Sequence, residues 1–171
     1  MFITSVVAVA FCSLKKVNSP NTSDNIKLDV LFSFAISYAS EWIIDEMKIG
    51  LTVSNPVFSL VYTQNTGAAF SILQGYPILL IVLSIVALIA LFSYVIRHAG
   101  TMSYTGIVWL SLLMSGIFCN LFERVQLGYV RDYIHLNFVE FPIFNLSDLA
   151  INISVIAIII LLLKTTQLKQ L

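Results

Sequence analysis

Two long runs without a charged residue constrain this chain more than any other feature of the sequence. They extend from Pro77 to Ile96 and from Tyr104 to Phe122. A helix that crosses about 30 Å of bilayer hydrocarbon needs roughly 20 mostly apolar residues, and each run has about that length. Both runs are therefore predicted to be transmembrane helices, and the chain is predicted to be a polytopic membrane protein.

Two shorter apolar runs complete a predicted set of four spans. The first of them contains Glu41, and the other reaches bilayer length only when its helix begins near Asn145 and so includes Asp148. An acidic side chain inside a span is costly, which makes both acids functional candidates. The predicted spans are residues 28–45, 77–96, 104–122 and 145–163, with outer loops at 46–76 and 123–144.

The composition excludes most other classes of protein. Of the 171 residues, 58% are hydrophobic and 11% are charged, against roughly 25% charged in a soluble domain. The net charge of zero gives no field that would attract a nucleic acid. The two cysteines, Cys12 and Cys119, lie in separate apolar runs, which argues against a disulfide framework and a zinc site. We therefore expect no nucleic acid, metal or cofactor.

Lysine and arginine positions predict the orientation of the spans. Six basic residues fall on one side, which is predicted to be the cytoplasm because cytoplasmic loops are rich in Lys and Arg. Both termini are then cytoplasmic, and the chain is one membrane-embedded domain, 1–171, with an N-terminal extension at 1–27. The six residues are Lys15, Lys16, Lys27, Arg97, Lys164 and Lys169.

The first outer loop contains a run typical of a β-strand. Val57 to Thr63 is rich in β-branched and aromatic residues, and a turn-like Asn-Thr-Gly begins at Asn65. This pattern predicts a short strand or hairpin outside the membrane. The expected fold is an all-α polytopic membrane protein with four transmembrane helices and a small extracytoplasmic β element.

The outer ends of the third and fourth spans collect polar residues that suggest acid–base chemistry. Asp132 lies in the second outer loop and Asp148 opens the fourth span, so the loop between them can bring the two carboxylates together. Paired carboxylates in a medium of low dielectric tend to share one proton. One can then accept a proton from water while the other donates, which permits peptide hydrolysis without a metal. Candidate supporting residues are Asn65, Asn120, Asn145 and Arg124.

Each of these residues also has a simpler interpretation. Asp148 taken alone is as well explained as the cap of a helix, and Asp132 taken alone as a solvated loop residue. Asn120 inside a span can bond a neighbouring helix. Glu123 and Arg124 are adjacent, so on a helix they face different directions and each can form a salt bridge elsewhere.

Three sequence blocks resemble the lipoprotein signal peptidase family, also called signal peptidase II. The blocks are YTQNTGAAFS (62–71), GIFCNLFERVQLGYVRDYI (116–134) and FNLSDLAIN (144–152). Members of that family are aspartic peptidases of the bacterial cytoplasmic membrane with four helices and an active site at the outer leaflet. The resemblance implies that Asp132 and Asp148 form the catalytic dyad. It implies supporting roles for Asn65, Gly67, Asn120, Arg124 and Asn145.

The resemblance also implies a substrate. It is a prolipoprotein whose cysteine carries diacylglycerol, and the family cleaves the bond on the N-terminal side of that cysteine. The implied partners are this substrate and membrane lipid, and we expect the chain to be a monomer.

The chain departs from the family pattern at several positions, two of which lie beside Asn120 and Arg124 of the predicted site. Cys119 replaces a glycine and Glu123 replaces an aspartate in the stretch CNLFER. These changes keep open a second hypothesis, a catalytically lapsed relative with a binding role. A third is a small transporter, which predicts carboxylates near the middle of spans.

Overall fold

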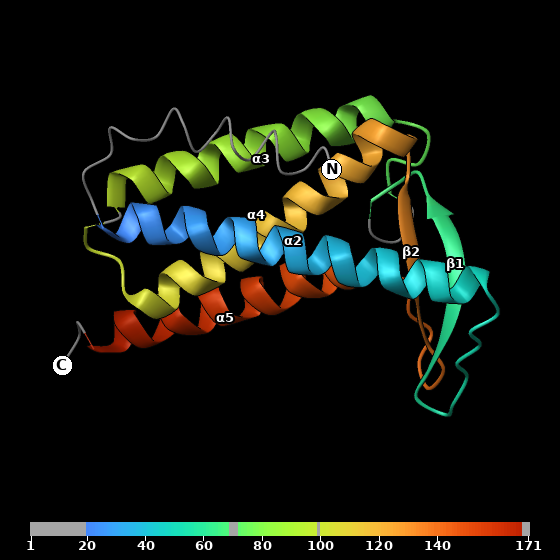
Figure 1. Ribbon diagram of the computed structural model, residues 1–171. Coiled ribbons are helices and arrows are strands. Elements are labelled where there is room, and N and C mark those ends of the chain that lie inside the picture. The colour runs from blue at the N-terminus through green and yellow to red at the C-terminus, as the bar shows by residue number, and fades with distance from the viewer. Residues whose placement is uncertain (1–19, 69–71, 99, 169–171) are drawn as a thin grey trace.

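The computed structural model describes residues 20–68, 72–98 and 100–168. Four helices, α2 (Pro20–Lys48), α3 (Pro77–His98), α4 (Tyr104–Leu127) and α5 (Leu146–Leu168), run side by side. Two strands, β1 (Phe58–Asn65) and β2 (Val130–Leu136), form a ribbon at one end of these helices (Figure 1). The beginning of α2 and the end of α5 both lie at the opposite end.

Three of the four described helices are long and apolar enough to cross a membrane: Pro77–His98, Tyr104–Leu127 and Leu146–Lys164. This confirms three of the four predicted spans by length and composition. The helix α2 is not among them, because it carries acidic residues near both ends of its apolar stretch, Asp29 and Glu41 among them. The helix also begins at Pro20, so the end of the predicted 1–27 extension is helical, whereas 1–19 lies outside the described residues.

The helix α4 is the centre of the bundle, since it packs against each of the other three helices. Its buried positions include several small residues, Ser111, Ser115, Gly116 and Cys119, which let neighbouring backbones approach closely. A Cβ atom on Gly116 would lie 2.7 Å from the carbonyl oxygen of Ser147 on α5. This glycine therefore sets how closely the C-terminal half of α4 meets the start of α5.

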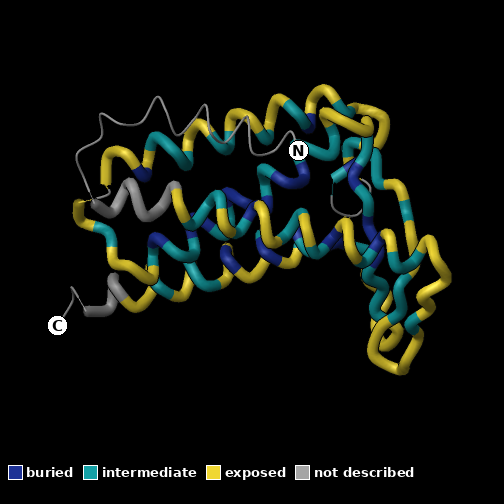
Figure 2. The backbone as a smooth tube through the Cα atoms, in the orientation of Figure 1, coloured by how far each residue is buried: buried dark blue, intermediate teal, exposed yellow. Residues whose placement is uncertain are grey.

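Many positions along the helices are exposed, as the yellow stretches of the tube show (Figure 2), and large apolar residues are among them. Ile78 is 76% exposed, Ile89 62% and Leu162 60%. A contiguous apolar surface of this extent marks a contact with lipid or with another protein. In helices of bilayer length, this pattern indicates faces that lie against lipid tails.

The end of α4 differs from the prediction. The helix continues past residue 122 to Leu127, because the polar residues that follow the apolar run keep their helical hydrogen bonds. It ends at Gly128, which has φ of +82° and donates its backbone N–H to the carbonyl of Arg124 at 3.0 Å. Glycine suits this left-handed position because it has no Cβ atom. Glu123 and Arg124 therefore lie on a helix instead of in a loop.

The β element is not a hairpin within the first outer loop, as one form of the prediction had it. The strand β1 pairs antiparallel with β2 from the second outer loop, with Thr63 opposite Asp132 and Asn65 opposite Val130. On its other edge β2 bonds to Phe144, which exchanges backbone hydrogen bonds of 2.8 and 3.0 Å with Ile134. Sequence periodicity could not reveal this pairing, because the partner strands lie in loops far apart in the chain.

Candidate active site

Asp132 lies in the middle of β2 and is 2% exposed. The interpretation of this residue as a solvated loop acid was therefore wrong. The buried backbone of the segment is satisfied by β1 on one side and Phe144 on the other, so the strand can carry an acid into the interior. Its carboxylate accepts a hydrogen bond on each oxygen, at 2.9 Å from Asn65 Nδ2 and at 2.8 Å from Asn145 Nδ2.

Asp148 is the third residue of α5, and it forms a reciprocal cap with Asn145. The backbone N–H of Asn145 donates to Asp148 Oδ2 at 3.2 Å, and the backbone N–H of Asp148 donates to Asn145 Oδ1 at 3.0 Å. This is the geometry of a capping box at a helix start. The interpretation of Asp148 as a helix cap is therefore correct but incomplete, because its second oxygen accepts from Asn120 Nδ2 at 2.7 Å.

Two amides connect the two carboxylates. Asn145 Nδ2 donates both to Asp132 and, at 3.3 Å, to Asn120 Oδ1, while Asn120 Nδ2 donates to Asp148. All four carboxylate oxygens thus accept one N–H bond, and each keeps lone-pair capacity for a further donor. Asn120 does bond a neighbouring helix, α5, and its partner there is Asp148, an acid predicted to be functional.

The remaining predicted residues close the same network. Asn65 Oδ1 accepts from the backbone N–H of Gly67 at 2.9 Å, which turns the chain after β1. The carbonyl of Gly67 accepts from Arg124 Nη2 at 2.8 Å, and Arg124 Nη1 donates to the carbonyl of Asn120 at 3.3 Å. The structure therefore brings all seven predicted site residues into one hydrogen-bonded network.

The surroundings of Asp132 favour its protonated form. Burial first, and then the charge of Asp148, raise the pKa of Asp132, which is about 7 against an ordinary value of 3.8. The amides of Asn65 and Asn145 and the charge of Arg124 oppose this rise. A carboxyl group that titrates near pH 7 can serve as a proton donor at neutral pH.

A pocket of about 180 Å³ opens beside this network. Its polar wall contains Asn65, Arg124 and Asp148, and its other side is apolar, with Phe141, Phe144 and Ile151 among its lining residues. A mostly apolar pocket with a few convergent polar groups is the usual form of a substrate site. Within the described ranges, no group of three His, Cys, Asp or Glu side chains could hold a metal ion.

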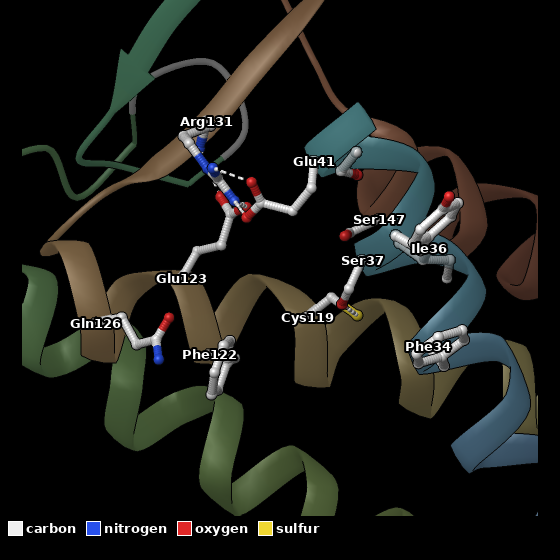
Figure 3. A pocket seen from close by; sticks show the side chains of 12 residues that line it. Phe34, Ile36, Ser37, Glu41, Cys119, Phe122, Glu123, Gln126, Arg131 and Ser147 are labelled. Atoms are coloured by element: carbon white, nitrogen blue, oxygen red, sulfur yellow. Dashed lines mark hydrogen bonds and ion pairs between the residues drawn. The ribbon is translucent and has the colours of Figure 1, made fainter. Parts of the chain in front are cut away.

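Behind Asp132 lies a second pocket of about 210 Å³, between α2 and α4 (Figure 3). At its outer end Arg131 lies between Glu41 and Glu123, with ion-pair distances of 2.6 and 2.7 Å from its Nη2. The expected separate salt bridge is thus found for Glu123, and Arg124 has no ion pair among those found in the described part of the chain. Sequence reasoning did not single out Arg131, because its two partners lie on two different helices.

Comparison with known proteins gives the family of the chain. A family model described as signal peptidase (SPase) II matches residues 28–164, which include the whole polar network. The chain belongs to the signal peptidase II family. It is therefore a peptidase and a hydrolase, which confirms the resemblance seen in the three sequence blocks.

Individual relatives support this assignment along most of the chain. A lipoprotein signal peptidase of Streptococcus thermophilus is 33% identical over 133 residues, which are 74% of this chain and 84% of the relative. One from Lactobacillus johnsonii is 34% identical over 140 residues, with 80% and 89% covered. A bacterial membrane enzyme solved by the in meso method is similar in structure, with a TM-score of 0.73, 34% identity, and 84% and 90% of the two chains covered.

Proposed function

We propose that this chain removes signal peptides from diacylglyceryl-modified prolipoproteins, by cleaving on the N-terminal side of the lipidated cysteine. The family membership supports the reaction class. The names of the curated relatives, lipoprotein signal peptidases, support the substrate class. In this proposal Asp132 and Asp148 are the catalytic residues, and Asn65, Gly67, Asn120, Arg124 and Asn145 hold and orient them.

The observation that carries the proposal is the amide bridge between two buried carboxylates. Asn145 and Asn120 link Asp132 to Asp148 with no cation paired directly to either acid among the ion pairs found in the described residues. An arrangement that only stabilised the fold would not need two buried acids, because a buried carboxylate without a paired cation is costly. Neutral amide partners fix the positions of the acids and leave them able to exchange protons.

The proposed mechanism activates water between the two acids. Asp132, whose pKa is raised to about 7, begins protonated, and Asp148 begins as the carboxylate. Asp148 takes a proton from water as the water oxygen bonds to the scissile carbonyl carbon, and Asp132 protonates the carbonyl oxygen. When the C–N bond breaks, Asp148 gives its proton to the leaving amine and Asp132 regains one from a hydroxyl of the intermediate. The dyad thus returns to its starting state.

The membrane placement of the site follows from the same proposal. In it α2 is the first of four spans, both termini are cytoplasmic, and the ribbon lies at the outer surface of a bacterial cytoplasmic membrane. A diacylated substrate is held in the bilayer, so acids at the outer ends of α4 and α5 meet the scissile bond near the headgroups. Tethering of the substrate lowers the entropic cost of orienting that bond. We expect a monomer to suffice, because the network is complete within one chain.

The direct test is cleavage of a diacylglyceryl-modified prolipoprotein by the purified protein in detergent or lipid. We expect Asp132→Asn and Asp148→Asn each to lower turnover by 10⁴-fold or more, because each removes one of the two proton-transfer groups. Asp45→Asn is the matched control, since Asp45 is an exposed acid on α2 that pairs with Lys48, and it should cleave at the parent rate.

Near-normal cleavage by either dyad variant would contradict the assigned roles. Absence of turnover by well-folded parent protein would instead favour the lapsed relative.

The orientation is tested separately by labelling single cysteines introduced in the ribbon and after α5 with a membrane-impermeant reagent in whole cells. Labelling only at the ribbon is expected, and labelling at the C-terminus would contradict the proposed topology.

A further inference from the structure

The two neighbours of Asp132 on β2 both bind α2, a helix that supplies none of the seven predicted site residues. Side chains on a strand alternate between its faces. Arg131 and Tyr133 therefore share one face, turned toward α2, while Asp132 points to the opposite face and its amide partners. The partners on α2 are Ser40 and Glu41, which are consecutive in the sequence.

Arg131 is held by two carboxylates from two helices. Its Nη2 donates to Glu41 Oε1 at 2.6 Å and to Glu123 Oε1 at 2.7 Å (Figure 3). Its Nε donates to Glu123 Oε1 at 3.0 Å and its backbone N–H donates to Glu123 Oε2 at 2.7 Å. The side chain of Arg131 is 14% exposed and that of Glu123 is 16% exposed. The backbone bond fixes β2 itself, one residue before Asp132.

Tyr133 gives a second attachment one residue after Asp132. It is fully buried, and its hydroxyl lies 2.8 Å from Ser40 Oγ. The same hydroxyl accepts from the backbone N–H of Leu146 at 3.3 Å. Leu146 is the first residue of α5, two residues before Asp148. One tyrosine thus connects α2, the strand of one proposed catalytic acid and the helix of the other.

We propose that the outer end of α2, through Ser40 and Glu41, positions the catalytic strand and sets the placement of Asp132 relative to Asp148. This inference rests on the proposed function, which makes both acids catalytic. Ser40 and Glu41 touch neither acid and neither amide of the bridge, so they are positioning residues. They act through Tyr133 and Arg131.

The physical reason is that acid–base catalysis tolerates only small errors in the positions of the catalytic groups. Catalytic groups must be held to within about 0.5 Å of their productive geometry, and a misplacement of 1 Å can cost about 10²-fold in rate. The ribbon has only two strands, and such a ribbon is marginally stable on its own. It therefore needs attachment from outside, and the contacts of Arg131 with Glu41 and of Tyr133 with Ser40 contribute to it on either side of Asp132.

The test is the double variant Ser40→Ala/Glu41→Ala, compared with Lys48→Met as a control. Lys48 also lies at the outer end of α2 and forms an exposed ion pair with Asp45. In the double variant we expect kcat per folded molecule to fall by about 10- to 100-fold, with KM changed less than about threefold. A purely structural role would lower the folded fraction and leave kcat per folded molecule unchanged.

The pH dependence gives a readout specific to positioning. The charged groups that act on Asp132 are Asp148 on α5 and Arg124 on α4. When β2 loosens, Asp132 gains water and moves away from Asp148, so its pKa falls toward its ordinary value. The upper limb of the pH–rate profile is then expected to shift to lower pH. The conservative variants Ser40→Thr and Glu41→Gln keep hydrogen-bonding groups and should restore most of the activity.

Carbon-13 NMR of labelled aspartate carboxyls, assigned with Asp132→Asn, separates this inference from the proposed function. A lower Asp132 pKa in the double variant supports positioning even if the parent protein does not cleave the prolipoprotein. An unchanged Asp132 pKa, or an unchanged kcat per folded molecule in a parent that does cleave, would overturn the positioning role.

Discussion

At the end of the helices that carries the ribbon, side chains of three pairs of consecutive residues lie in two different environments. Glu123, Arg131 and Ser147 line the pocket between α2 and α4, which we call the rear face. The next residue in each case, Arg124, Asp132 or Asp148, belongs to the polar network, which we call the front face. A strand turns alternate side chains to opposite sides, and a helix rotates about 100° per residue. Adjacent residues therefore end up in different environments.

The charged side chains of the two faces bind different kinds of partner. On the front face the acids bind neutral amides, and Asp132 has its pKa raised to about 7 by burial and by Asp148. On the rear face Arg131 forms direct ion pairs with Glu41 and Glu123. Burial alone would lower the pKa of Arg131, but its hydrogen bonds to these two acids raise it overall. Amide partners leave Asp132 on the front face able to titrate, whereas the ion pairs of the rear face keep the Arg131 guanidinium charged.

The sharpest test of this difference removes one amide from each face. Asn145→Ala breaks the bridge between the dyad and also removes a helix cap, so we expect kcat to fall by about 10²- to 10³-fold. Gln126→Ala removes an exposed amide from the rear pocket and should change kcat less than about twofold. Steady-state cleavage assays measure both, and equal losses would remove the functional distinction between the faces.

The second test uses the dependence of stability on pH. The pKa of folded Asp132, about 7, exceeds its ordinary value of 3.8. Its stabilising contribution is therefore complete below about pH 4 and is lost as the pH rises through 7. Between pH 5 and pH 8 the parent should lose on the order of 2–3 kcal/mol more than Asp132→Asn. Unfolding in detergent at the two pH values measures this loss, and parallel losses would contradict a raised pKa.

The third test compares two acids within the rear face. The Glu123 side chain is 16% exposed and accepts three bonds from Arg131, one of them from its backbone. We expect Glu123→Ala to reduce the free energy of unfolding by about 1.5–3 kcal/mol. Glu41 is 54% exposed, so Glu41→Ala should reduce it by less than about 1 kcal/mol. Denaturant titrations of the two variants give the order, and the reverse order would show that α2 holds Arg131 more strongly than α4 does.

The smallest expected effect comes from a substitution at the contact between α4 and α5, two helices that carry residues of both faces. In Gly116→Ala the new Cβ would meet the Ser147 carbonyl at 2.7 Å, and backbone cannot move aside cheaply. We expect a loss of stability on the order of 1–2 kcal/mol and a moderate loss of activity. Gly106→Ala, in the first turn of the same helix, meets only side-chain atoms at 3.3 Å and beyond. Its stability should stay within about 1 kcal/mol of the parent, because alanine favours the helix.

Asp132 and Asn145 show which parts of the site were predictable from the sequence. Asn145 was identified as a candidate because it opens an apolar run together with Asp148, and Asp132 because the loop between them can bring its carboxylate to that of Asp148. Their contact depends on the pairing of Phe144 with Ile134, which places Asn145 beside the strand. No local pattern reports such a pairing, and for the same reason the strand β1 was predicted without its partner.

Residue order and composition were enough to predict that the chain enters a membrane, where its apolar helices lie, and which acids and amides are candidates for the site. These properties follow from local composition and from the cost of placing charge in hydrocarbon. Three features became known from the packing of the elements. Asp132 is buried on a strand, and two amides connect it to Asp148. Its neighbours Arg131 and Tyr133 attach the strand to α2. These contacts join residues of β2, α2, α4 and α5, so they depend on how helices and strands pack and not on the order of neighbouring residues.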